Sequence, residues 1–494
     1  MAERILIIGA GIAGLGSAMA LARSDRTITI LDRDPPPSAD VEHAFEAWER
    51  KGVTQLRHSH VFLGCLVTLI RQKHPKLHEM LLNAGAREIG FQESLPPRLR
   101  DNVHPEADDE KMAFLFSRRT TLEHVMRGYV ETLPNVKFET EIRVKALLTE
   151  QGASTLEVRG AVIERDNAEP EQRLADIVID ACGRNTLLTD FLREQGADIT
   201  EEKSPAGILY FTRHYKLKPE QVEPPRDAIP GAGDLGYIKF GVFAADNRHF
   251  SITLAVPEIE SQLRTATFDP AIFDKICAQL PGAARWIATE RAEPVTKVFG
   301  MGNLYSVWKH FVKNGSPVVH NFFAVGDASI RTNPLYGRGC SIAVIHAHIL
   351  AEVFAKFPDA TQRAIAFDKH SRREIRPFWD ALVKQDLGAI RRALNEQQPN
   401  YKPRFKARLI KSFAEDAIGP ATRTNIDVYR AIMKAFHMLD APTLWLRQPM
   451  IIAKVLWTWA TPKSFKASLY PPKIGPDRAE MLSILRLTPS SNSN

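Results

Sequence analysis

The first part of the chain alternates apolar runs with segments rich in glycine or polar residues. Arg4 to Ile8 is an almost unbroken aliphatic run, which is typical of a strand buried on both faces. Leu15 to Arg23 is rich in Ala, Leu and Met and predicts a helix, and Thr27 to Leu31 predicts a second strand. A strand, a helix and a strand in this order predict a parallel βαβ unit and an α/β fold.

The same kind of pattern returns near residue 320. Asn321 to Val325 predicts another buried strand, and Ser341 to about Phe357 predicts a long helix. The chain from residue 361 onward is predicted to be mostly helical, with breaks at its prolines. Strand-like runs in the middle of the chain predict a second sheet: Gly207 to Tyr215, Tyr237 to Phe243 and His249 to Val256.

Composition narrows the class of protein. The 494 residues are 44% hydrophobic and 25% charged, as in ordinary globular enzymes. The 4 cysteines form no CxxC pair, which argues against zinc ribbons and dithiol reductases. The longest late apolar run, Pro449 to Pro462, is broken by Lys454 and is too short to span a bilayer. We therefore expect a cytoplasmic protein without a transmembrane segment, with peripheral membrane association as an open alternative.

Charge is distributed unevenly along the chain. The net charge is +7, yet the segment from Ser371 to the end holds 21 Lys and Arg against 10 Asp and Glu. A basic last quarter on a mildly acidic body favours an anionic partner, such as a membrane surface, an acidic carrier protein or a phosphorylated ligand. A solvated helical face is the simpler alternative. Nucleic acid is not expected, because the basic residues are interleaved with Leu, Ile and Trp.

A glycine-rich turn joins the first strand to the first helix. It reads Gly9-Ala-Gly11-Ile-Ala13-Gly14, and Asp32-Arg33 follows the second strand 18 residues after Gly14. In this context the first glycine permits the tight turn, the second admits a pyrophosphate and the third lets helix and strand pack closely. Asp32 is suited to accept hydrogen bonds from a ribose. A second match, Gly231 to Gly236, lacks this strand and helix context and is predicted to be a loop.

A second fingerprint begins 312 residues after the first. Gly326-Asp327 follows the strand at Asn321 to Val325, and a turn from Pro334 through Gly337 to Gly339 opens the next helix. Together the two fingerprints resemble those of FAD-dependent monooxygenases of the aromatic hydroxylase (p-hydroxybenzoate hydroxylase-like) superfamily. The resemblance implies that Asp327 holds the ribityl and pyrophosphate side of FAD. It also implies that the Pro334 turn lies beside the flavin ring, where a helix N-terminus favours negative charge.

Two further segments extend the resemblance. Ser117-Arg118-Arg119, followed by Leu122-Glu123, resembles the segment in which an arginine reaches the cofactor; Arg119 is the better match and Arg118 the alternative. Val144 falls where the family's backbone meets adenine. Lys51 to His60 resembles a segment of bacterial squalene and polyene epoxidase-like enzymes, which implies that Gln55, Arg57 and His58 flank the flavin. No metal site is predicted, and covalent flavin attachment through His58 is left open.

Two motifs depart from simple expectation. Cys182 stands where aromatic hydroxylases carry an aspartate of their middle motif, and Asp180 comes two residues earlier. This form is similar to epoxidases, halogenases and prenyl reductases, and it leaves the electron donor open between NADPH, NADH and a separate reductase. Trp457-Thr-Trp459 resembles a halogenase motif, but it lies 130 residues after Asp327 rather than before it.

The resemblance implies a glutathione reductase-type, Rossmann-like FAD-binding domain with an inserted α+β substrate domain and a helical C-terminal region. The predicted boundaries are 1–75, 112–185 and 318–360 for the FAD domain, 76–111 and 186–317 for the substrate domain, and 361–494 for the helical region. Candidate pocket walls are Phe211, Phe240, Phe243 and Trp308.

The implied activity is an NAD(P)H-dependent monooxygenase, a hydroxylase or epoxidase. It would oxygenate a small hydrophobic alkene or electron-rich aromatic with O2 through a flavin C4a-hydroperoxide. No catalytic side chain is assigned, because the cofactor supplies the chemistry. The alternatives are a flavin-dependent reductase of isoprenoid double bonds, a flavin-dependent halogenase and a non-catalytic flavoprotein.

Overall fold

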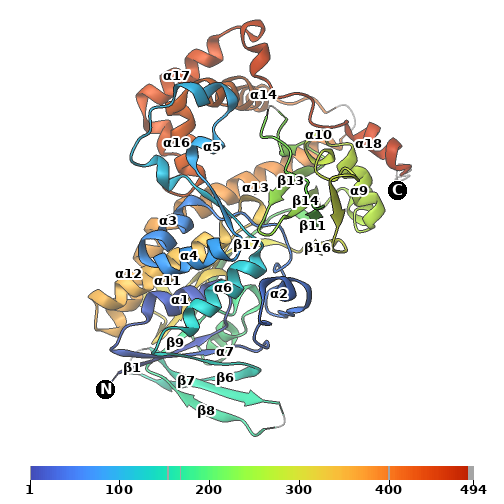
Figure 1. The fold of residues 1–494 in the computed structure, drawn as a ribbon. Coiled ribbons are helices and arrows are strands. Elements are labelled where there is room, and N and C mark those ends of the chain that lie inside the picture. The colour runs from blue at the N-terminus through green and yellow to red at the C-terminus, as the bar shows by residue number, and fades with distance from the viewer. Residues whose placement is uncertain (1, 153–154, 167, 228, 399–400, 488–494) are drawn as a thin grey trace.

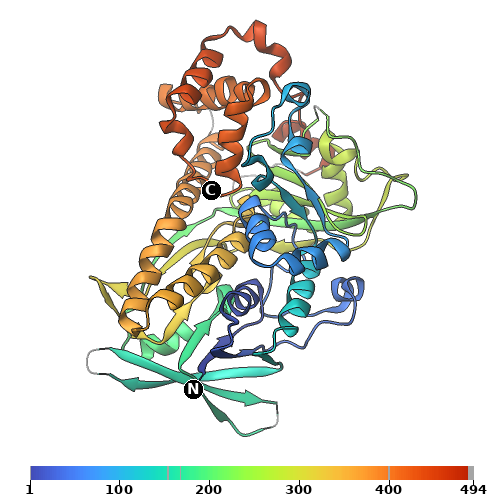
Figure 2. The same ribbon diagram turned by 60° about the vertical axis from the view of Figure 1, so that its left-hand side comes forward.

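The computed structural model describes residues 2–152, 155–166, 168–227, 229–398 and 401–487. Figures 1 and 2 show three regions along the long axis of the molecule. The parallel sheet and a β-meander lie at one end, an antiparallel sheet lies at the middle, and helices from the last quarter of the chain form the other end.

A five-stranded parallel sheet forms the base of the fold, in the order β21-β9-β1-β2-β5. Its central strand, β1, is the aliphatic run predicted from the sequence, and its apolar side chains are buried on both faces. The strands are β1 (Glu3–Ile8), β2 (Arg26–Leu31), β5 (Val136–Glu139), β9 (Ile177–Asp180) and β21 (Phe322–Ala324). Because all five run in one direction, their carboxyl ends meet at one edge of the sheet.

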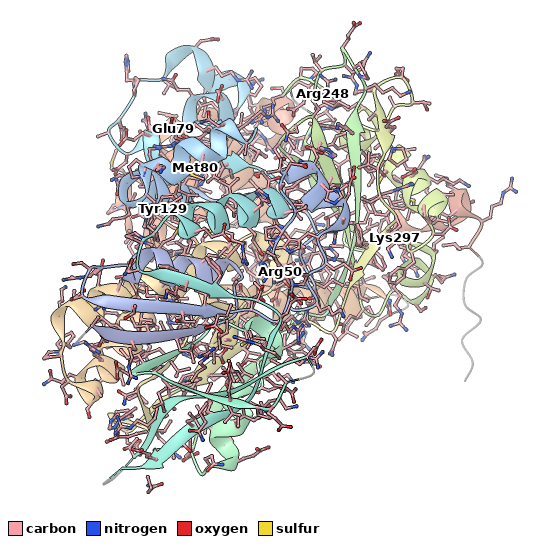
Figure 3. All side chains as sticks on the ribbon, turned by 60° about the horizontal axis from the view of Figure 1, so that its bottom comes forward. Arg50, Glu79, Met80, Tyr129, Arg248 and Lys297 are labelled. Atoms are coloured by element: carbon pink, nitrogen blue, oxygen red, sulfur yellow. The ribbon has the colours of Figure 1, made fainter. Side chains whose placement is uncertain are left out.

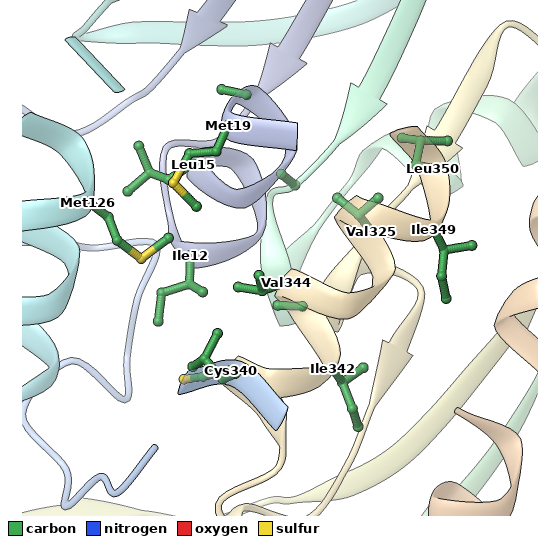
Figure 4. Close-up of a cluster of buried hydrophobic side chains, with 14 of the residues drawn as sticks. Ile12, Leu15, Met19, Met126, Val325, Cys340, Ile342, Val344, Ile349 and Leu350 are labelled. Carbon is green, nitrogen blue, oxygen red and sulfur yellow. The ribbon is translucent and has the colours of Figure 1, made fainter. Parts of the chain in front are cut away.

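Helices α1 (Ile12–Leu21) and α11 (Gly339–Lys356) pack against each other through aliphatic side chains, with Leu15 and Val344 fully buried (Figure 4). The contact is close because Gly16 faces α11, where an added Cβ would lie 3.5 Å from Val344. Among the described residues α11 alone is long and apolar enough to cross a membrane, but most of it is buried within the molecule. Three more helices complete this core: α3 (Gly64–Lys73), α4 (Pro75–Asn83) and α6 (Arg119–Glu131).

The second sheet is antiparallel, in the order β12-β13-β14-β11-β15, with β16 also paired to β11. Its strands are β11 (Ile208–Leu217), β12 (Ala232–Asp234), β13 (Lys239–Ala244), β14 (His249–Pro257), β15 (Ala292–Pro294) and β16 (Phe299–Met301). One face packs on α8 (Ser261–Ala266), α9 (Pro270–Ala278) and α10 (Pro281–Ala284) through a core that includes Phe250, Phe273 and Leu280.

The loop predicted at Gly231 to Gly236 differs from the structure in part. Ala232–Asp234 forms β12, which pairs with β13 so that Gly233 lies opposite Phe240. Gly236 has a φ of +84°, and the Leu235 amide donates to the Ile238 carbonyl at 2.9 Å. This glycine-rich segment is therefore a hairpin, because its backbone finds partners in the neighbouring strand.

A meander of β6 (Ile142–Gln151), β7 (Leu156–Arg165) and β8 (Glu171–Leu174) covers the outer side of the parallel sheet, and β20 (Val319–His320) pairs with β7. The remaining strands form small sheets: β10 (Thr200–Pro205), β17 (Tyr305–His310) and β22 (Ile330–Arg331); β3 (Arg87–Ile89) and β4 (Phe114–Phe116); β18 (Val312–Lys313) and β19 (Ser316–Pro317). Helices α2 (Val41–Ala47), α5 (Phe91–Ser94) and α7 (Leu188–Glu194) lie in the connections.

The last quarter of the chain is helical, as predicted, but its helices belong to several cores. Helices α12 (Ala360–Glu374) and α13 (Arg376–Glu396) bring Phe367 and Trp379 into the core of the parallel sheet. Helix α18 (Arg478–Leu485) adds Leu482 to the core of the antiparallel sheet. A small separate core at the end of the molecule is formed by α15 (Gly419–Thr424), α16 (Ile426–Phe436), α17 (Pro449–Ala460) and the π-helical turn Phe413–Ile418 that extends α14 (Phe405–Ser412).

Candidate active site

A large cavity of about 1050 Å³ lies where the carboxyl ends of the parallel strands face the antiparallel sheet. Ligands of open α/β sheets bind at this position. The structure brings thirteen of the sixteen predicted cofactor residues to its lining: Gly9, Gly11, Ala13, Asp32, Arg33, Gln55, His58, Arg119, Val144, Asp327, Pro334, Gly337 and Gly339. They come from segments that are more than 300 residues apart in the sequence.

The glycine turn after β1 is sterically specified. Gly9 has a φ of +105°, and an added Cβ would lie 2.6 Å from the carbonyl oxygen of Ala181, the residue that follows β9. A Cβ on Gly14 would lie 1.9 Å from the Gly9 carbonyl oxygen. Gly11 differs, because an added Cβ there would meet no described heavy atom within 4 Å. Gly14 therefore serves helix packing, whereas Gly11 leaves room in the cavity for a ligand.

Two helix N-termini face this cavity. Helix α1 begins after Gly11 and α11 begins after Arg338, and neither has a capping side chain or an acidic residue in its first turn. Gly11 and Ala13 line the cavity beside one terminus, and Gly339 and Cys340 line it beside the other. Uncapped amides and the positive ends of two helix dipoles make both places suited to negative charge.

A buried ionic network lies at the cavity wall, with Arg50 at its centre. Figure 3 labels Arg50 among the side chains of the molecule. The Arg50 guanidinium lies 3.0 Å from Asp32 Oδ2 and 3.2 Å from Glu123 Oε2. Glu123 also accepts a 2.6 Å hydrogen bond from Arg119 Nε, and an Arg119 amino nitrogen lies 3.4 Å from His60 Nε2. Sequence reasoning did not select Arg50 or His60, although Arg50 directly precedes the Lys51 to His60 segment.

Asp32 keeps an unused acceptor within this network. Its Oδ2 accepts no hydrogen bond from the residues that the structure describes, despite the nearby Arg50 charge. Burial raises the pKa of Asp32 above its ordinary value, and the Arg50 charge opposes that rise. Such an oxygen fits the hydroxyl of a bound ribose.

Asp327 stands at the second fingerprint among three arginines. Burial raises the pKa of its carboxyl, and the charges of Arg119, Arg331 and Arg184 oppose that rise. All four side chains line the cavity. The positive charge exceeds that of the carboxylate, which is the balance needed beside a pyrophosphate. Arg118 does not reach the cavity lining; its guanidinium pairs with Asp246 at 2.6 Å.

Three predicted cofactor residues lie outside the lining. Gly14 and Gly326 act through packing, since a Cβ on Gly326 would lie 2.9 Å from the Ala13 Cβ. The prediction that Arg57 flanks the flavin is corrected. Its guanidinium instead donates to the carbonyl oxygens of Phe45, Glu46 and Trp48, at 2.9, 3.3 and 3.1 Å, and so fixes the end of α2.

Two of the four predicted pocket walls are also corrected. Phe240 and Phe243 line the cavity, but Phe211 and Trp308 do not. Phe211 alternates with the cavity-lining Tyr210 and points to the opposite face of β11, where it contacts Phe268. Trp308 points from β17 towards α13, with its ring 6.0 Å from that of Trp379. A strand's alternation separates the two faces, which amino-acid type alone does not.

A chain of polar side chains crosses the cavity wall between His58 and the antiparallel sheet. His58 Nδ1 lies 2.9 Å from Thr212 Oγ1, which lies 2.7 Å from Thr253 Oγ1. The chain continues through Ser59 and Ser251 in steps of 2.7 Å. Burial lowers the pKa of His58 to about 4, so its imidazole is neutral near pH 7. Four hydroxyls and one neutral imidazole can pass a proton along such a chain.

The rest of the wall on this side is mainly apolar. Met301, Leu304, Tyr336 and Ala255 line it together with the two phenylalanines. Phe436, at the end of α16, also lines the cavity, although sequence reasoning did not select it. The cavity therefore combines a positively charged, amide-rich end with an apolar end.

In the middle motif around Cys182, Asp180 has a structural role because it stabilises the turn that follows β9. Asp180 is fully buried, and its carboxylate accepts hydrogen bonds from the Cys182 amide at 3.0 Å and the Thr186 hydroxyl at 2.7 Å. Cys182 itself lines the cavity. Trp457 and Trp459 of the halogenase-like motif lie on α17, outside the cavity lining. In the part of the chain that the structure describes, no three His, Cys, Asp or Glu side chains are grouped to hold a metal ion.

Comparison with known proteins agrees with this geometry. Residues 4–352 match the family described as FAD dependent oxidoreductase (DAO). Protein Rv3254 of Mycobacterium tuberculosis is 24% identical over 365 residues, which cover 70% of this chain and 71% of that protein.

Solved structures share the fold. PqsL, a probable FAD-dependent monooxygenase from Pseudomonas aeruginosa, is 15% identical with a TM-score of 0.53, covering 79% of this chain and 98% of its own. The myxobacterial chondrochloren halogenase CndH is 16% identical with a TM-score of 0.57, covering 88% and 97%.

The family match spans both fingerprints, the cavity and the antiparallel sheet between them. The chain belongs to the FAD-dependent oxidoreductases. It is a flavoenzyme of the Rossmann-like α/β class with a helical C-terminal region.

Proposed function

We propose that this protein is an FAD-dependent monooxygenase that uses NADPH or NADH and O2 to oxygenate a small apolar alkene or electron-rich aromatic molecule. The observation that carries the proposal is the continuity of one cavity, from two anion-binding helix termini to an apolar wall on the antiparallel sheet. The epoxidase-like segment around His58 lines the cavity, and His58 contacts Thr212 of the antiparallel sheet, which supports the same assignment.

In this proposal the first fingerprint holds the adenosine and pyrophosphate of FAD. Asp32 accepts a ribose hydroxyl, Val144 lies beside adenine, and the N-terminus of α1 faces the pyrophosphate. Asp327 and Arg119 bind the middle of the cofactor, while the Pro334 to Gly339 turn and the N-terminus of α11 face the flavin ring. When bound, reduced FAD supplies the electrons that activate O2 for transfer of one oxygen atom.

The protein's own part is placement, exclusion of water and proton transfer. Phe240, Phe243 and Tyr336 hold an apolar substrate against the cofactor end of the cavity. The neutral His58 and the hydroxyl of Thr212 carry a proton between the reacting centre and the Ser251 end of the polar chain.

A matched pair of variants tests the substrate wall. Phe243→Ala opens the cavity, so we expect a raised KM and an altered preference for substrate size, with FAD content unchanged. Phe211→Ala removes core packing on the opposite face, so we expect a loss of about 3–5 kcal/mol in the free energy of unfolding. Substrate-dependent NAD(P)H oxidation and oxygen uptake measure the first effect, and urea unfolding measures the second. Equal kinetic effects of the two changes would contradict the assignment.

A flavin-dependent reductase of isoprenoid double bonds is a second candidate. The observation that favours it is the exposed apolar face of α17, where Trp457 is 80% exposed, because such a face suits an enzyme of lipid substrates. Product analysis under anaerobic conditions separates the two activities. A saturated product formed without O2 supports the reductase, whereas an oxygenated product that contains one atom from labelled O2 supports the monooxygenase.

A further inference from the structure

The end of the molecule formed by α14, α16 and α17 carries an unusual concentration of exposed apolar side chains. Trp457 is 80% exposed, Phe465 82%, Phe405 73% and Met450 69%. Large apolar residues this exposed are ordinary when isolated, but several on one small unit mark an interaction surface. Figures 1 and 2 place these helices at the end of the molecule farthest from the parallel sheet, and α5 and the residues that follow it pack against α16.

The apolar side chains on α17 follow helical spacing. Met450, Ala453, Trp457 and Ala460 recur every three or four residues and are exposed, while Ile451 and Val455 face the small core beneath. Helix α17 is thus apolar on both its inner and outer faces. With 12 residues it is about 18 Å long, too short to cross the hydrocarbon core of about 30 Å. An apolar outer face of this length fits a helix that lies along a membrane interface.

Basic side chains border this apolar face. Residues 401 to 470 hold 12 Lys and Arg against 4 Asp and Glu, although Arg430 and Lys466 are buried and do not reach this surface. On α14 the exposed Lys406 and Arg408 have no ion pair with any residue that the structure describes, and Leu409 and Ile410 lie exposed beside them. The end of α14 is held to α17, since Trp459 Nε1 donates to Ser412 Oγ at 3.2 Å. Basic residues next to exposed aromatic ones are the composition that binds anionic headgroups while the rings enter the interface.

The surface also lies close to the active-site cavity. Helix α16 packs beneath α17, and its last residue, Phe436, lines the cavity. Helix α16 therefore connects the proposed docking surface to the cavity, which an apolar molecule from a bound bilayer would have to reach.

We propose that the surface formed by α14, α17 and the turn Lys463–Leu469 docks on an anionic lipid bilayer, with Trp457, Phe465 and Met450 inserted at the interface and the α14 cations on the headgroups. A bilayer is favoured over an acidic protein because lysine is common here, and lysine is depleted in protein interfaces. The proposal is independent of the oxygenation chemistry, since binding is measured without turnover.

The test uses the full-length flavoprotein and vesicles of phosphatidylcholine, with or without phosphatidylglycerol, separated by sedimentation. The expected result is binding to the anionic vesicles that weakens as salt is added. Binding to vesicles of phosphatidylcholine alone should be weaker. Trp457→Ser combined with Phe465→Ser should reduce binding at least tenfold, as should Lys406→Glu combined with Arg408→Glu. Leu174→Ser combined with Val222→Ser is the matched control, because these side chains are 62% and 72% exposed elsewhere on the molecule.

FAD absorbance and thermal unfolding verify that each variant is folded. The proposal is overturned if the wild type stays in the supernatant with every vesicle, or if the surface variants sediment like the control. Binding of the wild type to a purified acidic carrier protein but not to vesicles, lost in the Lys406 and Arg408 variant, would also overturn it and identify a protein-docking surface instead.

Discussion

Arg50 places its guanidinium 3.0 Å from Asp32 Oδ2, so the carboxylate suited to a ribose forms an ion pair with a buried cation. The same guanidinium pairs with Asp34 and Glu123, and its side chain is only 2% exposed. Arg50 therefore ties the end of β2, the segment before His58 and helix α6 into one unit around the cavity.

Replacing Arg50 by Met should destabilise the protein strongly. The change removes the ion pair of buried Asp32 and one of the two cationic partners of both Asp34 and Glu123. Breaking a buried ionic contact in this way costs about 3–5 kcal/mol. Urea unfolding in the presence of added FAD measures the effect. Arg4→Met is the control, because Arg4 pairs with Asp176 at the surface, where such a pair contributes about 0–1 kcal/mol. Similar losses in both variants would contradict the role given to Arg50.

Gly11→Ala and Gly14→Ala should fail in different ways. An added methyl group at Gly14 collides with the Gly9 carbonyl oxygen, so we expect a large loss of stability or no folded protein. At Gly11 the methyl group meets no described protein atom, so the chain should fold normally but bind FAD at least about tenfold more weakly, a change of about 1.4 kcal/mol. FAD titration by fluorescence and thermal unfolding of the apoprotein separate the two effects. Unchanged FAD affinity in Gly11→Ala would contradict the assignment of the pyrophosphate to this turn.

Thr212→Val tests the polar chain at His58. The substitution keeps the shape of the side chain but removes the hydroxyl that contacts both His58 and Thr253. We expect unchanged FAD content, a fall of about tenfold or more in kcat and an altered pH profile of kcat. Thr265→Val, at an exposed position on α8, should leave all three quantities unchanged. A Thr212→Val enzyme with the wild-type pH profile would show that the chain carries no proton.

Buried histidines should make stability fall with acid. Burial lowers the pKa of His346 to about 3, below the ordinary value of 6.5. Above pH 6.5 both the folded and the unfolded forms of this residue are neutral. Between pH 6.5 and 3 only the unfolded form binds a proton, so folding loses up to about 1.4 kcal/mol per pH unit from this group.

The variant His346→Asn isolates that contribution. Asparagine can still accept the hydrogen bond that Gly326 donates to His346 Nδ1 at 3.3 Å, but it does not titrate. Unfolding free energies at pH 7, 6, 5 and 4 should fall less steeply for the variant than for the wild type. Parallel curves would mean that the pKa of His346 is the same in the folded and unfolded protein, which would contradict the lowering by burial.

The α/β frame could be predicted from the sequence because it depends on local signals. The aliphatic runs before Gly9 and Gly326 each lead into a glycine turn and a helix, a context that favours strands, and both fingerprints lie at the same sheet edge in the structure. Side-chain direction was harder to predict. Phe211 and Phe243 look alike in the sequence, yet only Phe243 faces the cavity, because register and strand pairing decide which face each residue occupies.

The ionic and polar networks could not be read from local sequence. Arg50 stands in the charged run Glu49-Arg50-Lys51, which is typical of a solvated surface, and its partners lie on β2 and α6. The chain from His58 to Thr212 and Thr253 joins a loop to two strands about 150 to 200 residues away. Such contacts exist only once the antiparallel sheet has folded over the cavity.

The absorbance spectrum of the purified protein, followed without oxygen as NADPH or NADH is added and then in air, tests the central claim most directly. The account predicts a yellow protein that one of the nucleotides bleaches and that air restores to its oxidised spectrum. A colourless protein that takes up no added FAD would contradict the cofactor site. A flavin that neither nucleotide reduces, with or without candidate substrates, would contradict the proposed NAD(P)H-dependent monooxygenase.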